Sequence, residues 1–142
     1  LYGVFGFTGV AIASRIVDGW GAYRTSLLSV SLVFAGILGW AVTAGNYLLM
    51  ALSVAVWGLG FAASNSMQQV RLVAAAPPMA SASVSLNTSV LYVGQAIGSA
   101  IGGILYGRDM LYGSGYVAAA FLLVAVLIVV VTRPRATDVT RR

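Results

Sequence analysis

Few side chains in this sequence could carry out acid–base, nucleophilic or metal chemistry. The 142 residues include no cysteine and no histidine, and the three acids are aspartates, at positions 18, 109 and 138. The chain therefore has no thiolate or imidazole to bind zinc or haem, and no Ser-His or Cys-His pair to form an activated nucleophile. We expect no enzymatic activity, no metal site and no cofactor.

One charged stretch stands out between uncharged runs. The sequence RIVDGWGAYRT, residues 15–25, carries three charges and two glycines. An aspartate at a helix start is favoured by the aligned amide dipoles, and its hydrogen bond to an arginine is strong where water is scarce. A loop that only orients a membrane protein needs cations, but it needs neither Asp18 nor glycines at fixed offsets. The stretch therefore predicts a role beyond orientation.

The segments around this stretch are too apolar for a soluble domain. The sequence is 60% hydrophobic and 8% charged, whereas soluble domains have about 45 to 50% apolar and about 25% charged residues. The net charge of +5 does not predict nucleic-acid binding, because arginines spread over so apolar a chain cannot form a face that follows phosphates. We expect a membrane protein whose main surroundings are the lipid bilayer.

Five stretches approach the roughly 20 apolar residues that a helix needs to cross a bilayer. Gly45-Asn46 predicts a tight turn, Pro77-Pro78 predicts a helix break, and Ser81 or Ser83 can cap the helix that follows. The predicted fold is all-α, a polytopic membrane helix bundle. Its spans are residues 1–17, 25–44, 47–67, 82–106 and 116–132, followed by a tail at 133–142.

The arginines predict an orientation for these spans. With five passes, Arg15, Arg24 and Arg71 fall on the same side as the four arginines of the tail, and only Arg108 falls on the other side. Arginine accumulates in cytoplasmic loops. We therefore expect a multi-pass protein of the inner (plasma) membrane with a cytoplasmic C-terminus.

The stretch at residues 18–24, placed between two membrane helices, resembles the signature loop of the major facilitator superfamily, G-x-x-x-D-R-x-G-R-[RK]. In that comparison Ser14 stands at the first glycine, Asp18 at the acid, Gly21 at the second glycine and Arg24 at the end of the basic pair. Gly19, Ala22 and Tyr23 depart from the usual basic residues. This eroded form is closer to the second copy of the motif, between helices eight and nine.

A longer stretch supports the same resemblance. MQQVRLVAAAPPMASASVSLNTSVLYVGQAIGSAIGGILYG, residues 67–107, is similar to the tenth-to-eleventh helix region of arabinose-efflux and multidrug-efflux permeases. The resemblance implies that the chain is the partial C-terminal domain, helices eight to twelve, of a twelve-helix secondary transporter. It implies proton-coupled efflux of a small organic molecule by alternating access, with the N-terminal half as the missing partner.

The resemblance also implies a role for the charged stretch. In the family this loop stabilises one conformation of the transport cycle through its acid. By the family's pseudo-symmetry, Arg71 is the expected partner of Asp18, while Gly21 permits the turn and Arg24 anchors the loop at the membrane surface. Asp18, Gly21, Arg24 and Arg71 are thus a predicted conformational latch. The alternative is that Asp18 only caps a helix.

Two further sets of residues are candidates for packing and binding. Gly94, Gly98 and Gly102 repeat every four residues, which lets another helix approach closely, either as a sliding or as a static contact. Aromatic and amide side chains of the membrane helices are candidates for a substrate cavity, although helix packing explains them as well. These cavity candidates are Trp57, Phe61, Asn65, Asn87 and Gln95.

A second function remains open. The chain could be a membrane scaffold or assembly subunit that pairs with other helices through its glycine face and transports nothing alone. An intramembrane enzyme is a poor third reading, because no histidine, cysteine or membrane-buried acid is available as a nucleophile, base or metal ligand.

Overall fold

The computed structural model describes residues 1–133, all of whose regular structure is helical. The elements are α1 (Tyr2–Val42), α2 (Tyr47–Ala75), the short 3-10 helix η1 (Pro77–Met79), α3 (Ala80–Gly107) and α4 (Leu111–Val131). Within residues 1–133, four helices are long and apolar enough to cross a membrane. The all-α prediction is therefore confirmed, and the prediction of membrane-spanning helices is confirmed as far as helix length and apolar composition are concerned. The predicted tail lies outside the described residues except at its first position.

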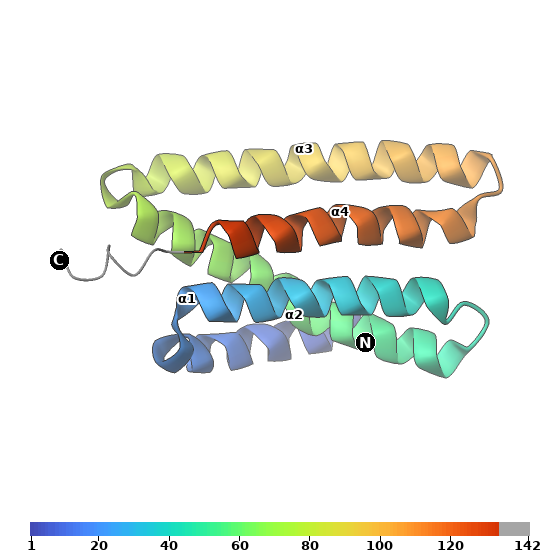
Figure 1. Cartoon of the computed structure of the whole chain (residues 1–142), viewed down its shortest axis with the longest axis horizontal. Coiled ribbons are helices and arrows are strands. Elements are labelled where there is room, and N and C mark those ends of the chain that lie inside the picture. The colour runs from blue at the N-terminus through green and yellow to red at the C-terminus, as the bar shows by residue number, and fades with distance from the viewer. Residues whose placement is uncertain (134–142) are drawn as a thin grey trace.

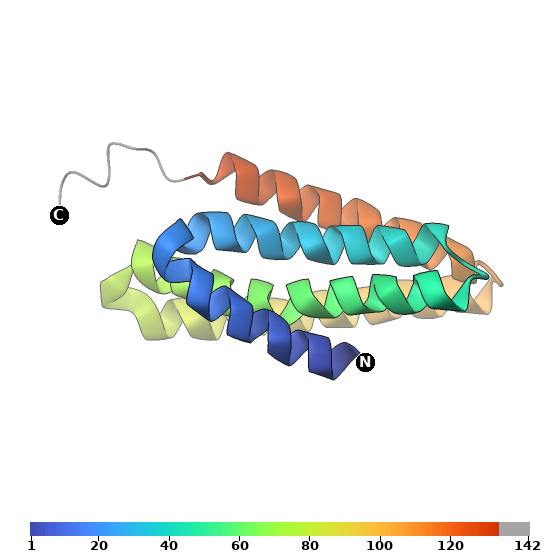
Figure 2. The same cartoon turned by 90° about the horizontal axis from the view of Figure 1, so that it is seen from below.

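The predicted count of five separate helices is not confirmed, because residues 2–42 form one assigned helix. Within it only Gly21 leaves the helical region, with φ 78° and ψ 154°. The expected loop at residues 18–24 is therefore helical on both sides of that single residue. Only glycine reaches such a conformation without a steric cost, so one residue suffices to reverse the chain. Figures 1 and 2 show α1 folding back on itself there, from a dark blue arm to a lighter one.

The chain reversals lie at two opposite ends of the molecule. The bend of α1, η1 and the C-terminal end of α4 lie at one end in both views (Figures 1 and 2), and the turns after α1 and α3 lie at the other. The Gly45-Asn46 turn is confirmed: Gly45 has φ 96°, and the Asn46 side chain accepts a hydrogen bond of 3.1 Å from the Leu49 amide. Asn46 thereby caps α2.

Two helix boundaries differ from the predicted ones. Helix α2 continues from the predicted end near Met67 to Ala75, because this segment contains good helix formers and no proline until Pro77. Helix α3 starts at Ala80 after the N-cap Met79, which makes no side-chain cap bond. The serine cap at Ser81 or Ser83 was therefore a wrong prediction. Prolines, which fix φ near the helical value, lead directly into η1 and α3.

Close packing is concentrated between α1 and α2, where backbones meet at glycines. A Cβ atom on Gly9 would overlap the backbone of Leu59, and one on Gly36 would overlap the backbone of Trp57. Likewise, a Cβ on Gly60 would lie 2.5 Å from the Ser29 carbonyl oxygen. Such backbone approach is typical of membrane helix pairs, which associate through small residues. Both arms of α1 therefore pack closely against α2.

Candidate functional site

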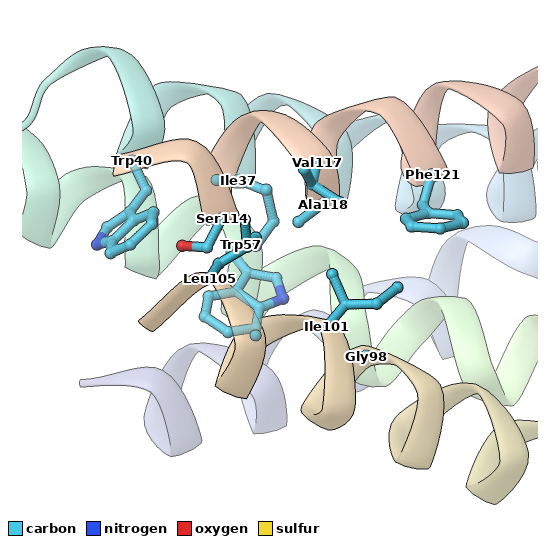
Figure 3. Close-up of a pocket in the computed structure, with 12 residues that line it drawn as sticks. Ile37, Trp40, Trp57, Gly98, Ile101, Leu105, Ser114, Val117, Ala118 and Phe121 are labelled. Carbon is cyan, nitrogen blue, oxygen red and sulfur yellow. The ribbon is translucent and has the colours of Figure 1, made fainter. Parts of the chain in front are cut away.

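An apolar cavity lies between all four long helices, near the end that carries the turns after α1 and α3. Its volume is about 390 Å³, within the size range of ligand pockets in proteins. Helix α1 contributes Trp40, α2 contributes Trp57, α3 contributes Ile101 and Leu105, and α4 contributes Phe121. Figure 3 shows Trp40 and Phe121 at opposite ends of this cavity, with Trp57 between them.

The chemistry of the lining favours a neutral, largely apolar occupant. No lining residue is charged, and the polar groups are the Ser114 hydroxyl and the two indole N–H groups of Trp40 and Trp57. Aromatic walls provide large contact areas at a small entropic cost, and an indole N–H that faces the cavity can orient a ligand through a hydrogen bond. An anionic or strongly cationic molecule would lose its hydration in this cavity without gaining a counter-charge.

One of the five predicted cavity residues lines this space. Trp57 does, and it also contacts Tyr2 and Phe61, with ring centroids 5.1 and 6.5 Å away. Phe61 is 41% exposed and packs with this aromatic group outside the cavity. Asn65 and Asn87 are half-buried and Gln95 is exposed, and none of the three is among the lining residues. Their predicted contact with substrate stays a prediction.

The glycine stripe of α3 faces open space within residues 1–133. A Cβ atom on Gly94, Gly98 or Gly102 would meet no other atom within 4 Å, and no residue of α3 is buried. Gly98 and Gly102 border the cavity. Packing of the stripe against a helix of another chain or segment therefore stays a prediction. Within residues 1–133, other glycines make close helix contacts, among them Gly9, Gly36 and Gly60.

Arg71 is the centre of a polar contact group at the opposite end of the bundle. It lies near the end of α2 and is half-buried. Its Nη1 donates to the Ser26 hydroxyl at 3.4 Å, and its Nη2 donates to the Thr132 hydroxyl at 3.2 Å. The guanidinium also lies over the Tyr23 ring, 5.6 Å from the centroid. Arg71 therefore connects α2 with α1 and with the residue that follows α4.

The predicted latch residues lie at this same end, but their ion pair is not formed in this conformation. Asp18 is exposed at the close of the first arm of α1, and Arg24 is exposed in the second arm. Among residues 1–133, Asp18 has no hydrogen bond or ion pair to Arg71, which contacts neutral side chains instead. Gly21 has the positive φ that the reversal of α1 needs. The Asp18–Arg71 latch stays a prediction about another conformation.

Sequence reasoning missed the buried hydroxyls that follow Gly21. Thr25, Ser26 and Ser29 are at most 3% exposed. Thr25 donates to the Gly21 carbonyl oxygen at 3.0 Å, and Ser29 donates to the Thr25 carbonyl oxygen at 2.8 Å. The signal was available, because small hydroxyl residues grouped on one face of a membrane helix commonly mark a close helix contact.

The predicted orientation can be tested at both ends. Alkaline phosphatase, which is active only outside the cytoplasm, should be inactive when fused after Arg142 in a bacterial host. The same enzyme inserted after Gly45, in the turn at the opposite end, should be active. The reason is the accumulation of arginine at the end that holds Arg24 and Arg71. High activity of the fusion after Arg142 would contradict this orientation.

No family model matches the chain, and no solved structure matches its fold.

Proposed function

We propose that this chain is part of a secondary active transporter that exports a small, largely apolar organic molecule by alternating access, coupled to protons. The observation that carries the proposal is the position of residues 18–24. This stretch, which resembles the signature loop of the major facilitator superfamily, lies where α1 reverses, at the same end as Arg71. A reversal between two apolar helical arms is the setting that such a loop requires.

The apolar cavity gives the proposed substrate its chemical class. It lies among four helices that are long and apolar enough to cross a membrane. Since its lining contains two indoles and no charge, a neutral aromatic or aliphatic compound is the proposed cargo. Proton coupling needs titratable groups inside the membrane, so we assign it to the proposed N-terminal half.

The transport proposal is tested by accumulation assays with the complete reading frame. Cells lacking the gene should accumulate more of an apolar fluorescent dye than cells carrying it, and a protonophore should remove the difference. The sequence upstream of Leu1 should encode about seven further membrane spans. Equal dye accumulation across a panel of neutral dyes, with both strains energised, would count against transport.

Truncation of Trp57 should impair export more than truncation of an exposed aromatic side chain outside the cavity. Trp57→Ala removes a wall of the cavity, and loss of such an anchoring aromatic contact corresponds to at least about a tenfold weaker interaction. We expect the substrate concentration for half-maximal export to rise by a similar factor. Tyr47→Ala, on the same helix as Trp57, is the matched control, because Tyr47 is 88% exposed and does not line the cavity. Equal effects of the two substitutions, at equal protein levels, would exclude this cavity as the substrate site.

A scaffold function is the second candidate, and the exposed glycine face of α3 favours it. If that face pairs with another helix, Gly98→Leu should abolish association of the chain with itself or with its missing half, because a leucine keeps the backbones apart. Ala100→Leu, at an exposed position off the stripe, is the control. Association is measured in a membrane two-hybrid assay, and an unchanged signal for Gly98→Leu would rule out pairing through this face.

A further inference from the structure

Arg71 carries a charge that the described part of the protein does not neutralise. Its two hydrogen bonds within residues 1–133 go to hydroxyl groups, at 3.4 and 3.2 Å, and its third contact is with an aromatic ring. A guanidinium has five N–H donors, so two bonds to hydroxyls leave much of its capacity for a further acceptor. A half-buried cation at the end of a membrane bundle is costly unless an anion accompanies it.

Two more arginines directly follow, in the sequence, residues that Arg71 contacts. Tyr23, beneath the Arg71 guanidinium, is followed directly by Arg24, and Thr132, which accepts from Nη2, is followed directly by Arg133. Both of these arginines are exposed, and no ion pair is found for either within residues 1–133. We call Arg24, Arg71 and Arg133 the arginine cluster. Asp18, the acid nearest in the sequence to Arg24, is exposed and forms no ion pair with these arginines within residues 1–133.

The cluster lies at the depth expected for lipid headgroups. The apolar part of α4 covers residues 113–131, which at 1.5 Å per residue extends about 28 Å, close to the thickness of the hydrocarbon core. Arg133 therefore follows directly on the membrane-crossing segment. Just before the cluster, α4 presents exposed apolar side chains: Ile128 is 57% exposed and Val131 is 82% exposed. A cationic group thus adjoins an apolar surface that faces outward.

From this arrangement we propose that the arginine cluster binds the phosphate of an anionic phospholipid, with the acyl chains along the exposed face of α4. Guanidinium groups bind phosphate oxygens through paired N–H donors, which lysine cannot match. The Ser26, Thr132 and Tyr23 contacts hold the Arg71 side chain in place before the lipid arrives, which lowers the entropic cost of binding. The apolar strip distinguishes a lipid from free phosphate. This site is independent of whether the chain takes part in transport.

The test is native mass spectrometry of the full chain in detergent, with added phosphatidylglycerol, phosphatidylcholine or inorganic phosphate. We expect phosphatidylglycerol to bind at least about tenfold more tightly than phosphatidylcholine, because only the former carries a net negative charge for the cluster. Arg71→Gln should remove most of this preference. Arg108→Gln is the matched control, since Arg108 is an exposed arginine at the opposite end and should leave the preference unchanged.

A second variant separates binding from folding. Arg24 and Arg133 are exposed, so the double change Arg24→Gln and Arg133→Gln should reduce the preference by about tenfold while the helical circular dichroism stays the same. Equal binding of the two lipids by the unmodified chain would overturn the proposal, as would an equal loss in Arg108→Gln. Inorganic phosphate that competes as well as phosphatidylglycerol at the same concentration would show a free-phosphate site instead and would overturn it too.

Discussion

The Gly9→Ala variant, solubilised in detergent, is expected to unfold at a lower concentration of sodium dodecyl sulfate than the unmodified chain. The Gly98→Ala variant is expected not to do so. A methyl group on Gly9 would overlap the Leu59 backbone in α2, and backbone atoms cannot rotate away as a side chain can. We expect a loss of about 1 to 3 kcal/mol or more in the free energy of unfolding, as for other overpacked contacts. Tryptophan fluorescence reports the transition, since Trp57 lies on α2, close in the sequence to Leu59.

Gly98→Ala is the control for Gly9→Ala. Gly98 is also helical, but a Cβ atom there meets no other atom within 4 Å. Alanine at that position should leave the stability unchanged or raise it by about 0.5 to 1 kcal/mol through the lower backbone entropy of the unfolded chain. If both substitutions shift the unfolding midpoint equally, the assignment of Gly9 to the close contact between α1 and α2 is wrong.

Asp18→Arg impairs transport by the complete protein, and adding Arg71→Asp restores part of it. This result is expected if the two residues form a latch in one conformation of the cycle, because the double change re-forms the pair with opposite polarity. A coupling free energy typical of such switches corresponds to about a five- to 150-fold change in an equilibrium constant, and we expect the transport rate to fall by a factor within that range. The rescue should be partial, since Arg71→Asp also removes the hydrogen bonds to Ser26 and Thr132.

The appropriate control combines Asp18→Arg with Arg108→Asp, which gives the same net charge but places the new acid at the opposite end. That variant should show no rescue. The comparison requires equal levels of each variant in the membrane. We expect this condition to be met, because an exposed ion pair contributes only about 0 to 1 kcal/mol to stability. Asp18 is helical and does not occupy an N-cap position of α1, so the cap interpretation is not supported. If Asp18 forms no pair with Arg71 in any conformation, neither double variant shows rescue, and such an outcome would remove the latch from consideration.

Residue type predicted one aromatic residue of the candidate cavity, but it did not predict the geometry of the site. The charged stretch indicated Asp18, the resemblance to the signature loop indicated Arg71 as its partner, and the mixture of aromatic and polar residues in one helix indicated Trp57. The other four candidates were chosen because they recur at four-residue spacing on a helix, yet they do not line the cavity. They are Phe61, Asn65, Asn87 and Gln95. Periodicity places residues on the same face of a helix, but it does not tell which neighbour that face meets.

The sequence by itself determined the helical class, the presence of helices long and apolar enough to cross a membrane, and the turn at Gly45-Asn46, because hydrophobic runs and turn residues act locally. The tertiary structure alone decided which glycines pack. Gly94, Gly98 and Gly102 have the more regular spacing, yet Gly9, Gly36 and Gly60 make the contacts. It also decided the partners of Arg71, which come from segments 45 and 61 residues away. Such contacts depend on how α1, α2 and α4 are arranged in space, and no local pattern encodes that arrangement.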